Sequence, residues 1–433
     1  MKEAIITLLT CCFAQFGFSQ PPQTTKLNNY VDTLELHNKF MGVICVNRAD
    51  QNIYTKSAGF SDIENRTPSS QSTKYRIGSI SKSFTAVMTF QAIEQGKITL
   101  STTLDNYFPN IKNANTTTID LLLGHRSGIH NFTDSNYPSW ATKNVSRSEL
   151  LKIIEQGGSD FAPATKAQYS NSNYVLLSYI LEDVYHKPFS EILQTYIIKP
   201  LKLANTSFGG LACKSYTYDK KWNIAAETDP SIPMGAGGIV STASDLNSFF
   251  SALFSEKLIS QNSLEQMKTM TDGFGRGLFQ MPFGSKIGYG HGGVIDGFNA
   301  ISIYFPEDKI AYSLTSNGEE YITNNISIAV LSAIYNIPFE IPNFTVIHYT
   351  SANLDKYLGV YSSEQLPIKI TITKVDSSLI AQGTGQSPFK LEASTDNHSF
   401  RFDKGGIVIL FDPTHGTMLL KQGGVSFLMK KED

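Results

Sequence analysis

A serine and a lysine three residues apart form the first candidate pair of a nucleophile and a base in this sequence. Ser79 and Lys82 open an apolar stretch whose large residues recur at helical spacing, namely Ile80, Phe84, Val87 and Met88. Positions i and i+3 share one face of a helix, so the Ser79 hydroxyl and the Lys82 amine can meet within one turn. A serine becomes a strong nucleophile when a base takes its proton, and a lysine serves as that base once burial or a nearby cation lowers its pKa.

A Ser-x-x-Lys pattern also arises by chance, and Ser387 and Lys390 form a second match near the C-terminus. Pro388 lies within that second match and makes a catalytic helical turn there unfavourable. Two further motifs follow the first match along the chain. Tyr169-Ser170-Asn171 precedes a helix-forming stretch, and Gly290-His291-Gly292-Gly293 precedes a strand-like run over 298–305.

In this order, the motifs resemble those of the serine β-lactamase and penicillin-binding-protein superfamily, in its class-C-like branch of D-aminopeptidases and esterases. That family carries Ser-x-x-Lys, Tyr-x-Asn and Lys/His-x-Gly, and the segments 122–128 and 237–242 match it as well. The resemblance covers about residues 25–340. It implies an antiparallel sheet flanked by helices with an inserted helical subdomain, an acyl-enzyme mechanism, and neither a metal nor an organic cofactor.

By this resemblance, Ser79 is the nucleophile that becomes acylated and Lys82 is its base or proton shuttle. Tyr169 is implied as a second proton relay, which requires Lys82 to lower its phenol pKa from an ordinary value of about 10. Which of the two is the general base stays open. Asn171 is implied to hydrogen-bond either the substrate amide or Lys82, and a helix N-cap is its structural alternative.

The glycine-flanked histidine is implied to bind substrate. His291 stands where many relatives have lysine, and a histidine that is largely neutral at pH 7 holds a substrate carboxylate weakly. This favours a peptidase or esterase over an efficient penicillinase. Gly292 and Gly293 suit a strand along which a substrate backbone approaches closely. The resemblance places the oxyanion hole at the backbone N–H groups of Ser79 and Val294.

Two further residues of the matched segments, His125 and Ser127, are expected to have a structural role, because a lone buried histidine usually satisfies a local polar contact.

Hydrophobic periodicity predicts elements that would position these residues. We expect a helix over 24–39, strands over 41–47 and 52–58, a helix-rich middle to about residue 290, strands over 298–305 and 310–315, and a helix over 324–336. Strands at both ends of this unit, 24–340, predict one antiparallel sheet. Prolines mark a linker over 341–350. Seven short strands within 351–433 predict a small β-rich domain, a lipocalin-like barrel.

Composition and the N-terminus bound the remaining possibilities. Hydrophobic residues make up 41% of the 433, which excludes a disordered chain, and a net charge of -2 gives no indication of a nucleic-acid partner. Residues 1–19 have the pattern of a signal peptide, which predicts export to the periplasm or the outside of the cell; lipid anchoring at Cys11 or Cys12 is less favoured. No later run is long enough to span a membrane. We expect Cys45 and Cys213 to be structural thiols rather than a disulfide.

The sequence thus predicts an exported serine hydrolase whose substrates are small molecules or short peptides: D-amino-acid peptides, small esters or β-lactams. Its oligomeric state stays open. The alternative is a non-catalytic, penicillin-recognising binding or scaffold protein that retains the pocket. For the C-terminal barrel three roles stay open: covering the mouth of the active site, binding a partner, or packing on the main domain.

Overall fold

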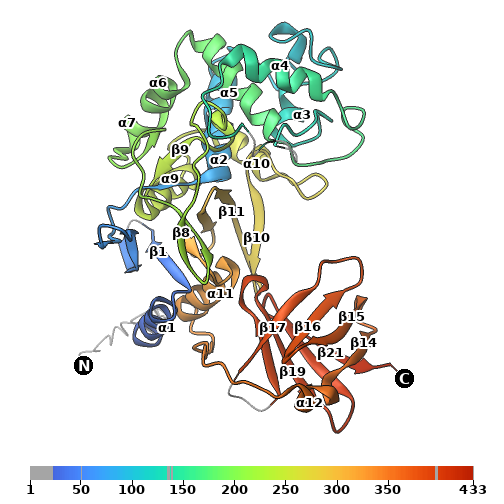
Figure 1. Ribbon diagram of the computed structural model, residues 1–433. Helices are drawn as coiled ribbons and strands as arrows, with labels where there is room; N and C mark the ends of the chain where they lie inside the picture. The colour runs from blue at the N-terminus through green and yellow to red at the C-terminus, as the bar shows by residue number, and fades with distance from the viewer. Residues whose placement is uncertain (1–22, 50, 134–136, 138–139, 395–397, 433) are drawn as a thin grey trace, which may run out of the picture.

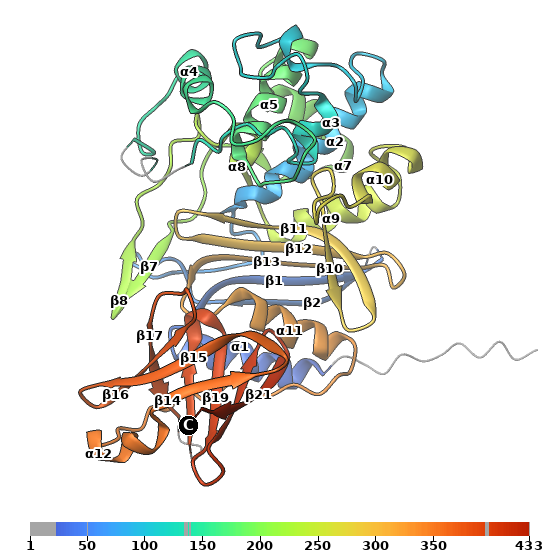
Figure 2. The same cartoon turned by 90° about the vertical axis from the view of Figure 1, so that its right-hand side faces the viewer.

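The structure is a computed structural model that describes residues 23–49, 51–133, 137, 140–394 and 398–432. The predicted signal peptide, residues 1–19, lies outside this part of the chain. Figures 1 and 2 show three parts stacked on one another: a helical region, a central sheet, and a C-terminal barrel. Across the described residues, no helix has both the length and the apolar character that a membrane span requires.

Six antiparallel strands form the central sheet in the order β10-β11-β12-β13-β1-β2. Their bounds are β10 (Phe279–Phe283), β11 (Lys286–Ile295), β12 (Phe298–Phe305), β13 (Ile310–Glu319), β1 (Phe40–Arg48) and β2 (Gln51–Ala58). Strand β1 pairs with β13 from Phe40 opposite Glu319 to Arg48 opposite Ile310. The prediction of one antiparallel sheet built from both ends of the unit is therefore confirmed.

Both faces of this sheet are covered. Alternate residues of β13 face opposite sides, so that Tyr312 packs with α1 (Thr24–Leu36) and α11 (Thr323–Ile334) while Ala311 belongs to the core on the other side. Helix α9 (Ala243–Phe254) covers that other side, where Phe254 stacks on Tyr304 of β12 at 4.8 Å between ring centroids. Figure 2 shows α1 and α11 below the sheet and the helical region above it.

The helical region, inserted between β2 and β10, surrounds one buried helix. Helix α2 (Ser81–Glu94) is buried over most of its surface, and its apolar residues are spread around the helix rather than confined to one face. Around it lie α3 (Ile119–Leu123), α4 (Arg147–Gly157), α5 (Asn171–Tyr185), α6 (Phe189–Leu193), α7 (Lys199–Leu201), α8 (Met234–Gly237) and α10 (Gln261–Lys268).

The predicted helix-rich middle is present, but it also contains short strands that were not predicted. These strands are β3 (Phe60–Asp62) with β4 (Thr67–Pro68), β5 (Tyr75–Arg76) with β9 (Ile239–Ser241) and β6 (Ser207–Phe208), and the hairpin of β7 (Tyr216–Asp219) and β8 (Lys221–Ile224). Strands β10 and β11 were also missed. Glycines interrupt the alternating pattern of β11, so the periodicity of a strand is weak in its sequence.

The C-terminal region closes into an eight-stranded barrel in simple sequential order. Its strands are β14 (Gly359–Ser363), β15 (Leu366–Val375), β16 (Ser378–Gly383), β17 (Phe389–Ala393), β18 (Ser399–Phe402), β19 (Ile407–Asp412), β20 (Thr417–Gln422) and β21 (Val425–Lys431). The seven predicted strands are all present, and β14 was missed. Tyr357, Phe400 and Met418 are among the apolar side chains that form the barrel core.

The barrel packs against the face of the sheet that α1 and α11 cover (Figures 1 and 2). At this contact Lys39 pairs with Asp403 at 2.7 Å and Lys404 pairs with Glu320 at 3.2 Å. The backbone N–H of Ile322 also donates to the Asp403 carbonyl. Residues 341–350 carry a single isolated bridge, from Val346 to Ser394, and no helix or strand.

Candidate active site

Ser79 lies in a tight helical turn, Gly78–Ile80, that leads directly into α2. Ile77 and Ile80 anchor this turn in the core, because both are buried, while Ser79 itself is half-buried and faces a cavity. Gly78 has a φ of +49°, a conformation that favours glycine. The predicted helix is confirmed, and Gly96 follows its last turn with a φ of +69°, as is common at a helix C-terminus.

Lys82 is fully buried, and its amine lies 2.9 Å from the Ser79 Oγ. The amine also donates to the Asn171 Oδ1 at 2.8 Å and to the Ala236 carbonyl at 2.7 Å. Burial lowers the pKa of Lys82 well below its ordinary value. A neutral amine fits these three contacts, because two N–H groups donate to the oxygens and the lone pair can accept the Ser79 proton.

The Tyr169 hydroxyl donates a hydrogen bond to the Ser79 Oγ at 2.7 Å, so the structure brings Tyr169 to the nucleophile as predicted. The expected lowering of its phenol pKa is wrong for the free protein, because burial raises the pKa of Tyr169. A neutral Lys82 supplies no positive charge that could offset that burial. Burial therefore shifts the two pKa values in opposite directions, Lys82 toward the neutral amine and Tyr169 toward the neutral phenol.

Asn171 is the first residue of α5 rather than its N-cap, which is Ser170. Its side chain binds Lys82 through Oδ1 and donates through Nδ2 to the Thr133 Oγ1 at 3.0 Å. Its backbone N–H donates to the Asn131 Oδ1 at 2.9 Å. Of the alternatives for Asn171, the contact with Lys82 is the one that the structure shows.

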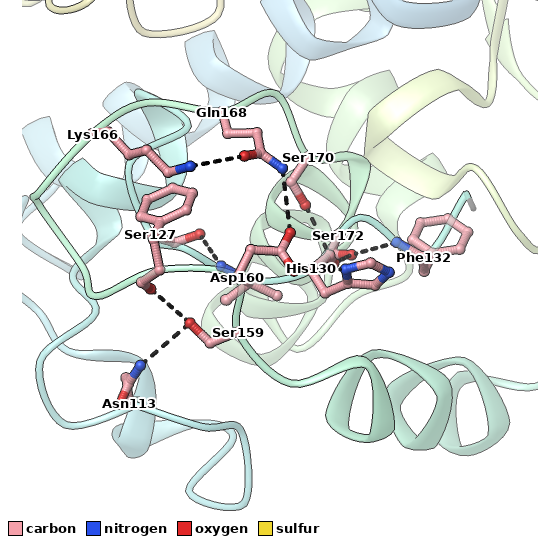
Figure 3. A network of polar contacts seen from close by, with 12 residues as sticks. Asn113, Ser127, His130, Phe132, Ser159, Asp160, Lys166, Gln168, Ser170 and Ser172 are labelled. Carbon is pink, nitrogen blue, oxygen red and sulfur yellow. Dashed lines mark hydrogen bonds and ion pairs between the residues drawn. The ribbon is translucent and has the colours of Figure 1, made fainter. Parts of the chain in front are cut away.

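A polar network holds the segment that carries Tyr169 and Asn171 (Figure 3). Asp160 contacts the His130 Nδ1 at 2.9 Å and accepts a hydrogen bond from the Gln168 Nε2 at 3.3 Å. Ser172 donates to the His130 carbonyl at 2.6 Å and accepts from the Phe132 N–H at 3.1 Å. These contacts fasten the segment before α5 to the loop that includes Asn131 and Thr133.

His125 supports Tyr169 from behind. The two rings stack with centroids 4.5 Å apart, and the His125 Nδ1 accepts a hydrogen bond from the Ser170 N–H at 3.2 Å. Burial lowers the pKa of His125 well below its ordinary value. Ser127 donates to the Asn173 Oδ1 at 2.6 Å. Both residues contact other parts of the scaffold and neither contacts Ser79, in keeping with a structural role.

His291 lies within β11 and is only 4% exposed. Burial lowers the pKa of His291 to about 3, so its imidazole is neutral. Its Nδ1 donates to the Gly292 carbonyl, and its ring lies against Phe279. The ring centroids of His291 and Tyr169 are 6.5 Å apart. His291 does not line the cavity at Ser79, and a buried neutral imidazole there does not attract a carboxylate.

The two backbone N–H groups predicted as an oxyanion hole belong to segments in direct main-chain contact. A Cβ on Gly293 would lie 1.9 Å from the Ile77 carbonyl and 3.0 Å from the Ser79 N. A Cβ on Gly78 would lie 2.8 Å from the Val294 N. Only glycine fits at these two positions, and the resulting contact brings the end of β11 beside Ser79.

A cavity of about 270 Å³ opens in front of Ser79. Its lining includes the predicted residues Asn171 and Val294, and residues that sequence reasoning missed: Phe132, Thr133, Tyr137, Thr228, Pro233 and Asp296. Most of these lie in irregular segments, where single side chains carry no periodic signal. Gly237, within the matched segment 237–242, also lines the cavity and was the one available pointer to that wall.

In the described ranges, no three His, Cys, Asp or Glu side chains form a group that could hold a metal ion. Cys45 and Cys213 are free thiols, as expected. The barrel packs on the face of the central sheet that α1 and α11 cover, while α2 lies on the other side (Figure 2). No barrel residue is part of the described lining of the cavity at Ser79, so the first of its three proposed roles is not what the structure shows.

Fold and chemistry together define a class of protein, the serine hydrolases with the β-lactamase fold. The chain belongs to the Beta-lactamase family, which matches residues 30–334. It is 29% identical over 328 residues to PbpX of Bacillus subtilis (strain 168), a candidate penicillin-binding protein, with 72% of this chain and 78% of that protein covered. It is 26% identical over 254 residues to the teichoic acid D-alanine hydrolase of Staphylococcus aureus (strain MRSA252), covering 56% of this chain and 60% of that protein.

Two solved structures extend the comparison. The D-amino acid amidase from Ochrobactrum anthropi SV3, in complex with L-phenylalanine amide, superposes with a TM-score of 0.64 and 25% identity, covering 72% of this chain and 99% of the amidase. The octameric penicillin-binding protein homologue from Pyrococcus abyssi gives a TM-score of 0.67 at 22% identity and covers 94% of this chain and 100% of that chain. The second likeness shows that the fold extends over the barrel as well.

Proposed function

We propose that this hydrolase works through an acyl-enzyme on Ser79, with Lys82 as general base and Tyr169 as general acid. The observation that carries the proposal is the fully buried Lys82 amine, 2.9 Å from the Ser79 Oγ. Among the ion pairs of the described chain, none gives Lys82 a carboxylate partner that would keep it charged. A neutral amine in hydrogen-bond contact with a half-exposed hydroxyl is an activated nucleophile.

In the proposed acylation, the Ser79 Oγ attacks the substrate carbonyl carbon as its proton passes to Lys82. The N–H groups of Ser79 and Val294 stabilise the negative charge on the carbonyl oxygen. Tyr169 then protonates the leaving amine or alcohol, and its phenolate regains a proton from the Lys82 ammonium. In deacylation, water attacks the acyl carbonyl, Lys82 takes the proton of the water, and Ser79 leaves with a proton from Tyr169. The Lys82 ammonium then returns its proton to the Tyr169 phenolate, which restores the resting enzyme.

As substrates we propose amides and esters of D-amino acids in preference to carboxylate-bearing β-lactams. The described lining of the cavity contains one charged residue, Asp296, and no cation. His291 is neutral and buried, so no positive group is present there to hold a substrate carboxylate. Two relatives act on D-amino acid groups, one as an amidase and one as a teichoic acid D-alanine hydrolase, and this supports the same substrate class.

The signal-peptide pattern of residues 1–19 supports export to the periplasm or the cell exterior as part of this proposal. Such a location would give the enzyme access to D-amino-acid groups of the cell envelope.

The first test is the intact mass of the protein after exposure to a fluorophosphonate. We expect one adduct on the wild type, none on Ser79→Ala, and one on the matched control Ser387→Ala, which alters the other Ser-x-x-Lys match. An unlabelled wild type with a cooperative thermal transition would overturn the enzyme proposal and favour a binding protein. An adduct retained by Ser79→Ala would overturn the assignment of the nucleophile.

A further inference from the structure

A buried ion pair joins the two segments that carry the proposed oxyanion donors. Arg76 ends β5, three residues before Ser79, and Asp296 follows β11, two residues after Val294. The Arg76 Nη1 lies 2.7 Å from the Asp296 Oδ2, and the two side chains are 7% and 6% exposed. Each charge thus lies within a few residues of one donor.

Thr228 brings a third segment into the same contact. Arg76 donates to the Thr228 carbonyl at 2.8 Å, while the Asp296 Oδ1 accepts from the Thr228 N–H at 3.0 Å and from its hydroxyl at 2.7 Å. The Asp296 carboxylate therefore has partners on both oxygens. Thr228 also lines the cavity, so these contacts fix one wall of the cavity relative to Ser79.

The main-chain contact between the two donor segments does not by itself fix how the two segments are aligned. Gly78 and Gly293 permit the approach but offer no side chain that could lock it, because a Cβ on either would collide with the opposite backbone. A buried, hydrogen-bonded ion pair contributes little net stability compared with apolar packing, since desolvation offsets the attraction, but its geometry is strict. Its expected contribution is therefore alignment of the two segments.

We propose that Arg76 and Asp296 are positioning residues that align the backbone N–H groups of Ser79 and Val294 on the developing oxyanion. This inference rests on the proposed acyl-enzyme function. Oxyanion donors act only in the transition state, so their misalignment lowers kcat and leaves KM nearly unchanged.

A different role for Asp296 makes an opposite prediction. Asp296 lines the cavity, and a carboxylate there could bind the ammonium group of a D-aminoacyl substrate directly. In that case its loss would raise KM for cationic substrates alone. The Arg76 contact and the two Thr228 contacts already occupy both carboxylate oxygens, and this favours the positioning role.

The experiment measures kcat and KM for the full chain and its variants on p-nitrophenyl acetate, whose acyl group is neutral, and on D-alanine p-nitroanilide, whose acyl group is cationic. We expect Asp296→Asn and Arg76→Met to lower kcat about 10- to 100-fold on both substrates, somewhat less than complete loss of an oxyanion donor, with KM within about threefold of wild type. Arg76→Lys keeps the charge and should recover part of the loss. Thermal unfolding reports whether each variant is folded, and Arg76→Lys serves if the others fail to fold.

The matched control is Lys286→Met, which removes the ion pair between Lys286 and Asp308 at the opposite end of β11. Its kinetics should equal those of the wild type. A KM increase confined to D-alanine p-nitroanilide, or unchanged kinetics in folded variants, would overturn the positioning role while the proposed function stands. A wild type that neither turns over a substrate nor takes the fluorophosphonate would overturn both.

Discussion

Two segments of this chain share the Ser-x-x-Lys pattern, and their surroundings differ in every respect that matters for chemistry. Ser79 and Lys82 lie one helical turn apart at the start of a helix, and Lys82 is fully buried. Ser387 precedes β17 and Lys390 lies within it, and both are exposed. The i, i+3 spacing that aligns two side chains on a helix directs them to opposite faces of a strand. The comparison shows that the same spacing brings the two side chains together in one place and not in the other, and the proposed catalysis depends on the helical geometry and burial of the first.

Replacing the lysine of each motif is the test of this comparison with the largest expected effect. Lys82→Arg keeps a positive charge but removes the proton acceptor, because a guanidinium does not lose its proton in a protein. We expect kcat/KM to fall about 10²- to 10⁴-fold, the range of a general base. Lys390→Arg, the matched control in the barrel, should equal the wild type in steady-state kinetics. Near-normal activity of a folded Lys82→Arg variant would contradict the assignment of Lys82.

The pH dependence of kcat/KM tests whether burial of Lys82 has the expected effect. Burial lowers the pKa of Lys82, so the neutral, active amine is lost as the pH falls through that lowered pKa. We expect kcat/KM to be level above this pKa and to drop about tenfold per pH unit below it, where Lys82 is protonated. A rate that climbs steadily up to pH 10 would show that Lys82 keeps the ordinary pKa of an exposed lysine.

A smaller effect is expected at His291. Replacing this neutral, buried imidazole with lysine restores the residue type that many relatives carry and introduces a cation beside Tyr169. We expect His291→Lys to lower KM for a carboxylate-bearing β-lactam about tenfold relative to D-alanine p-nitroanilide. His291→Gln, which adds no charge, is the control. An equal response to both substitutions would show that charge at this position has no part in substrate choice.

The smallest effect on catalysis is expected at the barrel, which packs on the far face of the sheet. Lys39→Met leaves the buried Asp403 with Arg401, at 3.3 Å, as its remaining ionic partner. We expect thermal unfolding to show a loss of about 2–3 kcal/mol, while kcat stays within twofold of wild type. Lys56→Met, which removes an exposed pair with Asp32 on the main domain, should cost less than about 1 kcal/mol. A large fall in kcat for folded Lys39→Met would indicate that the barrel influences the active site.

Local spacing explains how much of the fold and the site could be predicted. The Ser79–Lys82 contact, α2, β12, β13 and seven barrel strands follow from regular periodicity over short windows. Strands β11 and β14 were missed because glycine or short length hides their alternation. The Asp296 contact with Arg76 was missed because the two residues lie far apart in sequence and neither belongs to a local pattern.

The sequence by itself determined the order of the chemical groups and the pairing of Ser79 with Lys82, because those depend on a single helical turn. Their protonation, on which the proposed roles rest, depends on the tertiary structure. Burial among α2, α5 and α8 lowers the pKa of Lys82 and raises that of Tyr169, reversing the expected effect on the phenol. Packing within the sheet buries His291 as a neutral group. A pKa depends on the solvent and charges that the whole fold places around a group, and these lie beyond any short stretch of sequence.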